Sequence, residues 1–163
     1  MSSRSGIGYD SHRFAEGRRL VLGGVEIPGE RGLSGHSDAD VLTHALIDAL
    51  LGAAGLGDIG QHFPDTDERY KDADSIELLG EVCSFLDEHG WTIRHLDASV
   101  ICDAPKLSPH RDEMRSRLAS TIGLNALEVN VKFTTNEGLG FIGRGEGMAA
   151  LAIATVVLSC CAP

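Results

Sequence analysis

The sequence is poor in basic residues, in aromatic residues and in cysteine. Its 163 residues include 14 lysines and arginines against 24 aspartates and glutamates, which gives a formal charge of −10. A protein that coats a nucleic acid needs a basic face, so this charge excludes that class of function. Four cysteines, with Cys160 and Cys161 adjacent, have neither the density of a disulfide scaffold nor paired metal-site spacing. They predict a reduced, cytoplasmic protein.

Long apolar runs are also missing. The most apolar stretch, residues 148–158, is about half of the roughly 20 residues that a membrane helix requires, so we expect a buried element there and no membrane partner. Residues 1–8 contain no apolar core of a signal peptide, which predicts neither secretion nor organelle import. The hydrophobic fraction of 42% and the charged fraction of 23% are typical of a soluble globular protein. The length favours one domain over residues 1–163.

The first half of the chain shows one hairpin and two helices after an opening strand. Gly23-Gly24 separates two short apolar runs and is a strong two-residue hairpin signal. Apolar residues then recur with helical spacing over residues 37–55. A second helix is predicted over residues 74–90, with Asp74 and Glu77 as a capping box.

The second half continues the alternation of strands and helices. Residues 96–102 alternate with the period of a strand, and residues 108–123 have helical spacing that ends at a glycine. Residues 129–133 form another alternating strand, while the β-branched residues within 148–158 favour a buried strand. The pattern predicts an α/β (α+β sandwich) fold: a mixed β-sheet with helices packed on one face and a small β-hairpin.

Three residues have the chemistry of a metal site. Asp10 and His12 are two apart on an extended segment, so their side chains leave the same face, and His44 lies within the first helix. A carboxylate with two imidazoles suits Zn²⁺ with one open position. Asp40 and Asp48, one turn either side of His44, are the expected acceptors of its second ring N–H. An ordinary strand Asp-x-His and a helix-flank histidine remain the alternative interpretation.

Three further segments suit anions or sugars, although each also fits a purely structural role. His36 and Ser37 lie at the expected start of the first helix, where an anion is favoured or Ser37 simply caps the helix. The glycine-rich loop 55–67 carries acids that suit a metal, sugar hydroxyls or turns. In residues 130–147, threonines, an acid and Arg144 on a glycine-rich backbone suit phosphates. The G-x-G-x-x-G there precedes no amphipathic helix, so a dinucleotide fold is not supported.

Taken together, these segments resemble the 2-C-methyl-D-erythritol 2,4-cyclodiphosphate synthase family of the non-mevalonate isoprenoid pathway. The resemblance covers essentially the whole chain and depends on several motifs in family order. These are G-Y-D-S-H-R-F at 8–14, G-H-S-D-A-D-V-L-T-H-A-L at 35–46, D-A-L-L-G-A-A-G-L-G-D-I-G at 48–60, F-P-D-T-D at 63–67, A-P-K at 104–106 and G-L-G-F-I-G-R-G-E-G at 138–147.

The resemblance implies an α/β domain that assembles as a homotrimer, with each active site between adjacent subunits. It implies an enzyme, a lyase that converts 4-diphosphocytidyl-2-C-methyl-D-erythritol 2-phosphate into the cyclic diphosphate and releases CMP. Asp10, His12 and His44 are implied ligands of a zinc-type ion, and Glu137 of a second ion, Mg²⁺ or Mn²⁺. His36 and Thr135 are implied to stabilise the transition state.

The same resemblance implies a set of substrate-binding residues. One group surrounds the methylerythritol and ribose, a second forms the cytosine pocket with Lys106 near the phosphates, and a third completes the phosphate region. These residues are Asp10, His12, His36, Ser37, Asp58, Ile59, Gly60, Phe63, Pro64, Asp65, Thr66 and Asp67; Cys102, Asp103, Ala104, Pro105, Lys106, Leu107 and Ser108; and Thr134, Thr135, Asn136, Glu137, Phe141 and Arg144. The chain departs from common family residues at 107–108 and at 136–138.

The implied reaction needs no serine or cysteine nucleophile, because the attacking 2-phosphate is already part of the substrate. Two other functions are compatible with the same residues. One is a zinc phosphohydrolase, in which water attacks a nucleotide diphosphate and linear products form. The other is a non-catalytic trimer that binds isoprenoid phosphates.

Overall fold

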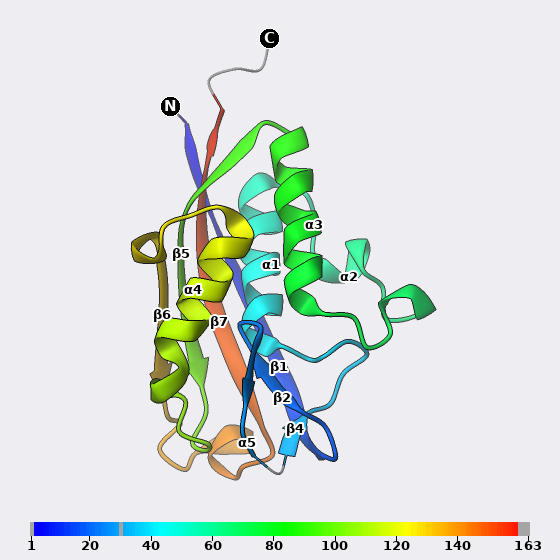
Figure 1. The fold of residues 1–163 in the computed structure, drawn as a ribbon, viewed down its shortest axis with the longest axis vertical. Helices are drawn as coiled ribbons and strands as arrows, with labels where there is room; N and C mark the ends of the chain where they lie inside the picture. Colours follow the sequence, from blue (N-terminus) through cyan, green and yellow to red (C-terminus); the bar gives the residue numbers. More distant parts are fainter. Residues whose placement is uncertain (1, 30, 160–163) are drawn as a thin grey trace.

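The helices α1 (Val41–Ala54), α3 (Ser75–Glu88) and α4 (Arg111–Ile122) cover one face of a five-stranded sheet (Figure 1). The structure is a computed structural model that describes residues 2–29 and 31–159. The short helices α2 (Ile59–His62) and α5 (Gly140–Gly143) lie in connections. The strands are β1 (Ser3–Glu16), β2 (Leu20–Leu22), β3 (Val25–Ile27), β4 (Arg31–Leu33), β5 (Trp91–Ile101), β6 (Val129–Thr134) and β7 (Gly147–Leu158).

The sheet is mixed, as the sequence predicts. Its strand order is β4-β1-β7-β5-β6, in which β5 and β6 are parallel and the other neighbours are antiparallel. The hairpin of β2 and β3 stands apart as a two-stranded sheet. Its turn residues, Gly23 and Gly24, have φ angles of 57° and 71°, the left-handed values that a two-residue turn requires.

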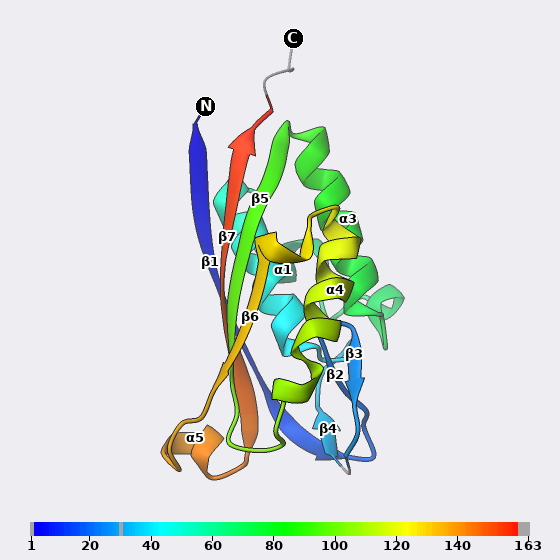
Figure 2. The ribbon, with the colours of Figure 1, turned by 60° about the vertical axis from the view of Figure 1, so that its left-hand side comes forward.

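The strand β7 is central to the sheet, and its residues alternate between a buried face and a face free of helices (Figure 2). Ala150, Ala152, Ala154 and Val156 point into the core, where small side chains let helix α1 approach closely. Helix α1 lies between the sheet and α3, and all but two of its residues are buried. This double packing explains why its sequence is apolar on almost every side.

Two glycines of β1 determine how closely α1 approaches the sheet. A Cβ atom on Gly8 would lie 1.9 Å from the backbone oxygen of Ala45, and one on Gly6 would lie 2.2 Å from that of Ala49. Both neighbours are helix backbone, which does not move aside as a side chain does. Because alternate residues of a strand share a face, Asp10 and His12 follow Gly6 and Gly8 onto the face that α1 covers.

The first helix begins later than the sequence predicts. Its N-cap is Asp40 and not Ser37, because the chain between them turns through Ala39 at a φ of 58°. The fully buried Asp40 carboxylate accepts hydrogen bonds from the backbone of Thr43 at 3.0 Å, Gly23 at 2.9 Å and Gly24 at 2.8 Å. One carboxylate thus caps the helix and fixes the hairpin.

The second helix begins where predicted, with Asp74 accepting from Ile76 N at 2.8 Å. Within residues 2–29 and 31–159, the Asp74 side chain accepts from Ile76 N and not from Glu77 N, and the Glu77 side chain accepts no hydrogen bond from Asp74 N, so the predicted capping box is not formed. The strands predicted in the second half are confirmed as β5, β6 and β7, and α4 ends at Gly123 as expected.

Cys83 and Cys102 are free thiols, while Cys160 and Cys161 lie outside the described residues. Burial raises the pKa of Cys83 to about 12 and that of Cys102 to about 11. Neither is therefore a nucleophilic thiolate at neutral pH. Across the part of the chain that the structure describes, no helix is both long and apolar enough to cross a bilayer.

Candidate metal centre

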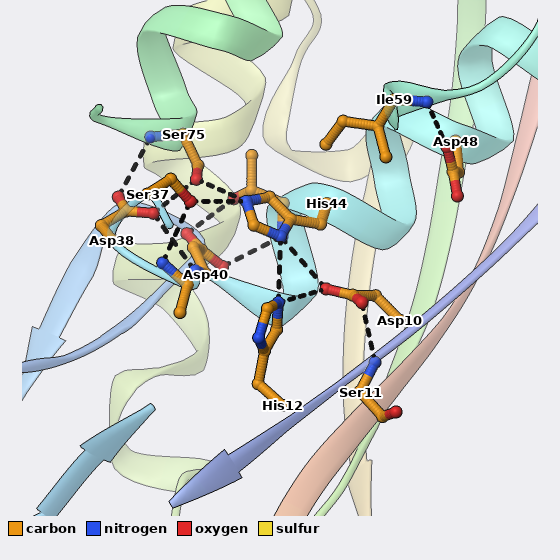
Figure 3. A network of polar contacts seen from close by, with 12 residues as sticks. Asp10, Ser11, His12, Ser37, Asp38, Asp40, His44, Asp48, Ile59 and Ser75 are labelled. Carbon is orange, nitrogen blue, oxygen red and sulfur yellow. Dashed lines mark hydrogen bonds and ion pairs between the residues drawn. The ribbon is translucent and has the colours of Figure 1, made fainter. Parts of the chain in front are cut away.

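Asp10, His12 and His44 meet at the contact between β1 and α1 (Figure 3). Asp10 Oδ2 lies 2.9 Å from His12 Nε2 and 3.1 Å from His44 Nδ1, and the two ring nitrogens are 3.3 Å apart. In a tetrahedral site with metal–ligand distances near 2.0–2.1 Å, neighbouring ligand atoms lie about 3.3 Å apart. The three atoms are therefore spaced closely enough to share one ion, as the sequence predicts.

The outer contact of His12 makes its inner nitrogen an acceptor. Nδ1 of His12 lies 2.7 Å from the backbone oxygen of Ser34, to which it donates, so Nε2 of the neutral ring carries the lone pair. That lone pair faces the Asp10 carboxylate, which is itself an acceptor. Converging acceptors repel one another unless a proton or a cation lies between them. The donor set thus fits a zinc-type ion.

Without an ion, protons on the imidazoles take over part of this role. Burial raises the pKa of Asp10, but hydrogen bonds from His12 and His44 outweigh it and hold that pKa well below its usual range. Burial lowers the pKa of His12, yet its hydrogen bond with Asp10 gives a net increase. The carboxylate is therefore ionised at neutral pH and available as a ligand.

The prediction that Asp40 and Asp48 accept from the second nitrogen of His44 is wrong. Asp40 is occupied by the helix cap, and Asp48 accepts from Ile59 N at 2.8 Å. Nε2 of His44 instead lies 2.9 Å from Ser75 Oγ and 3.2 Å from Ser37 Oγ. Asp40 caps α1 and Asp48 reaches Ile59 in α2, while Ser75 reaches His44 from the start of α3 (Figure 3).

A cavity of about 450 Å³ opens beside the three residues. Many of the predicted substrate residues line it, because the loop before α1 and the segment around α2 face each other across it. Asp58, Thr66 and Asp67 belong to the same segment but do not line the cavity. The lining comprises Asp10, His12, Gly35, His36, Ser37, His44, Ile59, Gly60, Phe63, Pro64, Asp65, Tyr70 and Leu78.

Gly35, Tyr70 and Leu78 are lining residues that the sequence analysis missed. Tyr70 packs edge-on against Phe63, with ring centroids 5.3 Å apart. No local pattern marks these residues, since a single tyrosine in a loop and a leucine in an amphipathic helix are ordinary structural residues.

The remaining predicted residues form a separate group at the end of the sheet where β5 and β6 finish. Residues 102–108 follow β5 and residues 134–137 end β6, and Cys102 N donates to Thr134 O at 3.0 Å. Asp103 accepts from Asn136 N at 2.6 Å and Gly138 N at 2.9 Å, so it holds the second segment beside the first. None of these residues lines the cavity beside His44.

Within that group, several side chains already have partners. Thr135 donates to Glu137 Oε1 at 2.6 Å, and Arg144 donates to Glu146 Oε1 at 2.7 Å. The side chain of Leu107 is 3% exposed and belongs to the core, which leaves its backbone as the part available to a ligand. Phe141 is 38% exposed and lines a smaller hollow with His12.

Comparison with known protein families identifies the family of this chain. The profile of the YgbB family matches residues 3–157, nearly the whole chain. A relative from Alkaliphilus oremlandii named 2-C-methyl-D-erythritol 2,4-cyclodiphosphate synthase is 57% identical over 154 residues, 94% of this chain and 98% of its own length. The chain belongs to the YgbB family.

Solved structures agree with this membership. The bifunctional IspDF from Campylobacter jejuni superimposes with a TM-score of 0.93 at 46% identity, over 96% of this chain and 42% of that longer one. A 2C-methyl-D-erythritol-2,4-cyclodiphosphate synthase in a form bound to CDP superimposes with a TM-score of 0.86 at 39% identity, over 94% of this chain and all of that one. The mixed α/β fold is therefore that of the YgbB family.

The loop that carries His36 and Ser37 is fixed by Arg18. Its guanidinium donates to the backbone oxygens of Leu33 at 3.3 Å, Gly35 at 3.3 Å and Ser37 at 2.5 Å. It also contacts the Asp72 carboxylate at 3.3 Å. Arg18, which the sequence analysis did not single out, therefore holds one wall of the cavity beside His44.

Removing this guanidinium will loosen the loop. In Arg18→Ala we expect backbone amides of residues 34–38 to exchange with solvent about tenfold faster or more, because each lost hydrogen bond contributes about 1 kcal/mol. Hydrogen exchange followed by mass spectrometry measures this. Arg19→Ala is the matched control, since Arg19 contacts only the exposed Glu26 among the described residues. Equal exchange of this loop in both variants would contradict the role given to Arg18.

Proposed function

We propose that this chain converts 4-diphosphocytidyl-2-C-methyl-D-erythritol 2-phosphate into 2-C-methyl-D-erythritol 2,4-cyclodiphosphate and CMP. The main support is that Asp10, His12 and His44 place three metal-binding acceptors on the wall of a cavity. The chain is also 57% identical to an enzyme named for that product. Two of the three relatives described above are named synthases, and nothing in the site favours a phosphohydrolase or a non-catalytic binder.

In this proposal Asp10, His12 and His44 hold a zinc-type ion, and Glu137 holds a second ion, Mg²⁺ or Mn²⁺. Divalent ions in such positions supply Lewis-acid polarisation and charge neutralisation of phosphate oxygens. The proposed reaction needs these ions, because a chain with a net charge of −10 has few basic side chains to bind a diphosphate. Lys106 and Arg144 are the cations assigned to the substrate.

The protein itself mainly folds the substrate. Because the 2-phosphate and the β-phosphorus belong to one molecule, holding them in line removes most of the entropic cost of the attack. His36 Nε2 lies 3.1 Å from the backbone oxygen of Asp67 and donates to it, which leaves Nδ1 for a phosphate oxygen. In this proposal Nδ1 is the nitrogen that donates to that oxygen. Thr135 is the second proposed donor.

The substrate contacts are proposed to divide between the two groups of residues. Ser37, Asp58 and the loop 63–67 surround the methylerythritol and ribose, while residues 102–108 hold the cytosine. A solved relative in a form bound to CDP supports a cytidine nucleotide as the ligand. Since the cavity beside His44 contains no residue of the 102–108 loop, a complete site needs that loop from a second copy of the chain.

The face of the sheet free of helices supports assembly into a homotrimer. Ile7 and Tyr9 of β1 are 67% and 55% exposed, and they pair with Ile153 and Leu151 of β7, which are 47% and 40% exposed. Figure 2 shows that no helix covers this side of β1 and β7. Four adjacent apolar side chains on one face favour self-association. We place the assembled enzyme in the cytoplasm.

Light scattering tests the assembly. The expected mass is three times that of the 17.3 kDa chain, and Ile153→Asp is expected to shift the population to monomer because it places charge in the apolar patch. Leu127→Asp is the control, since Leu127 is 88% exposed on the short turn before β6. A monomeric wild-type protein would overturn the proposed homotrimer.

The activity is tested by ³¹P NMR of the purified protein with the cytidyl substrate, Mg²⁺ and Zn²⁺. We expect resonances of a cyclic diphosphate and of CMP. We also expect His44→Ala to lose most turnover and its bound zinc, because the ion would keep only two protein ligands. Linear methylerythritol phosphates in place of the cyclic product would establish a phosphohydrolase, and an unchanged substrate spectrum would establish a binding protein.

A further inference from the structure

The second nitrogen of His44 faces a buried polar chain that the proposed reaction does not use. Nε2 lies 2.9 Å from Ser75 Oγ, and Ser75, the first residue of α3, is fully buried (Figure 3). Ser75 in turn contacts Asp38, in the loop before α1, by two hydrogen bonds. Three elements therefore meet at one imidazole: α1, the start of α3 and the loop that carries His36 and Ser37.

The direction of the hydrogen bonds in this chain follows from the chemistry of its members. Ser75 N donates to Asp38 Oδ2 at 3.0 Å, and the Ser75 hydroxyl contacts Asp38 Oδ1. A carboxylate only accepts hydrogen bonds, so the single hydroxyl proton of Ser75 goes to Asp38. The lone pairs of Ser75 Oγ are then left to accept a proton from His44, and Nε2 is the nitrogen that donates it.

The direction of these hydrogen bonds favours one tautomer of His44. A neutral imidazole carries one proton, so a proton on Nε2 leaves the lone pair on Nδ1. Nδ1 is the nitrogen that faces Asp10 Oδ2 at 3.1 Å and His12 Nε2 at 3.3 Å. His12 is oriented in the same way by Ser34 O, which accepts from its Nδ1. Both rings thus direct a lone pair inward.

At Nδ1, Asp10 Oδ2 competes for the proton of His44 from 3.1 Å unless a cation lies between them. At Nε2, Ser37 provides the one competing contact among the described residues. Its Oγ lies 3.2 Å from His44 Nε2 and also accepts from Ala39 N at 3.2 Å. If the Ser37 hydroxyl donated to Nε2, the proton of His44 would move to Nδ1 and block the inward lone pair. The Ser75 contact is shorter and its hydroxyl proton is already given to Asp38, so Ser75 is the acceptor at Nε2. An ion beside Asp10 then takes the lone pair of Nδ1.

We propose that Asp38 and Ser75 are positioning residues that keep the proton of His44 on Nε2 and its Nδ1 lone pair available to a metal ion. This inference rests on the metal site of the proposed function. It assigns to Asp38, through Ser75, the role that an acidic residue has when it contacts a metal-binding histidine directly. It also links the start of α3 to the metal site, because Ser75 orients His44 only when α3 is in place.

The direct test is ¹⁵N NMR of the imidazole nitrogens in the zinc-loaded protein, in which the ion removes the competition of Asp10 for the proton of His44. The wild-type chain is expected to show a protonated Nε2 and an unprotonated Nδ1 at His44. This measurement needs no variant and no activity. A wild-type His44 with its proton on Nδ1 would overturn the inference, whatever the protein catalyses.

Asp38→Ala is the sharpest variant, because it removes the carboxylate that accepts the hydroxyl proton of Ser75. The Ser75 hydroxyl is then free to donate to His44 Nε2. The proton of His44 is expected to move to Nδ1, and zinc affinity to fall about 10- to 100-fold.

Ser75→Ala removes the acceptor and is expected to mix the two tautomers and to weaken zinc by a similar factor. Ser84→Ala is the matched control, since Ser84 lies on the exposed side of the same helix and donates to Gly80 O. Competition of each metal-free protein with a chelator for Zn²⁺ gives the affinities. Wild-type affinity within twofold in Asp38→Ala, with the proton still on Nε2, would refute the positioning role. A wild-type chain that binds no zinc would refute the metal site and, with it, the inference that rests on that site.

Discussion

The contact between helix α1 and strand β1 determines where the chemistry of this protein lies. Gly6 and Gly8 have no Cβ atom, and the helix backbone at Ala45 and Ala49 occupies the space where one would be. A strand with side chains at these positions would hold the helix farther away. Because Asp10 and His12 continue the same face of β1, the close approach that the glycines allow also brings His44 within 3.1–3.3 Å of them.

That contact creates a concentration of acceptors that calls for a cation. A half-buried carboxylate and two imidazole lone pairs repel one another unless positive charge lies between them. The substrate also calls for a cation, because a diphosphate meets few basic side chains in a chain of net charge −10. A divalent ion satisfies the protein and the substrate together. In the proposed function, divalent ions supply the neutralisation of phosphate for which the chain has few basic residues.

Much of this structure is predictable from local patterns in the sequence. The strand around Asp10, the hairpin at Gly23-Gly24 and helix α1 all follow from periodicity and turn chemistry, and each is found in the structure. The grouping of Asp10 and His12 follows from the two-residue repeat of a strand. That His44 joins them does not follow from spacing; the residue types suggested it, the family motifs implied it, and the glycine contact explains it.

The errors at the metal centre concern interactions between distant segments. Asp40 and Asp48 are one helical turn from His44, yet the Asp40 carboxylate caps α1 and binds the hairpin, while the Asp48 carboxylate binds Ile59 N. The true partner, Ser75, is 31 residues away and lies at a helix start, where serine is usual. Arg18 likewise acts on backbone oxygens, which leave no trace in residue type. Sequence patterns show which face a residue occupies, but tertiary packing decides which neighbour it meets.

The central claim is that the glycine contact assembles the metal site, and Gly8→Ala tests it most directly. Urea unfolding and zinc titration of this variant are to be compared with those of Gly80→Ala, whose added Cβ meets nothing within 4 Å in helix α3. Gly8→Ala is predicted to lose about 3 kcal/mol or more of unfolding free energy and to bind zinc at least about tenfold more weakly. Gly80→Ala is predicted to be slightly more stable, with unchanged zinc affinity. Wild-type stability and zinc affinity in Gly8→Ala would contradict the account.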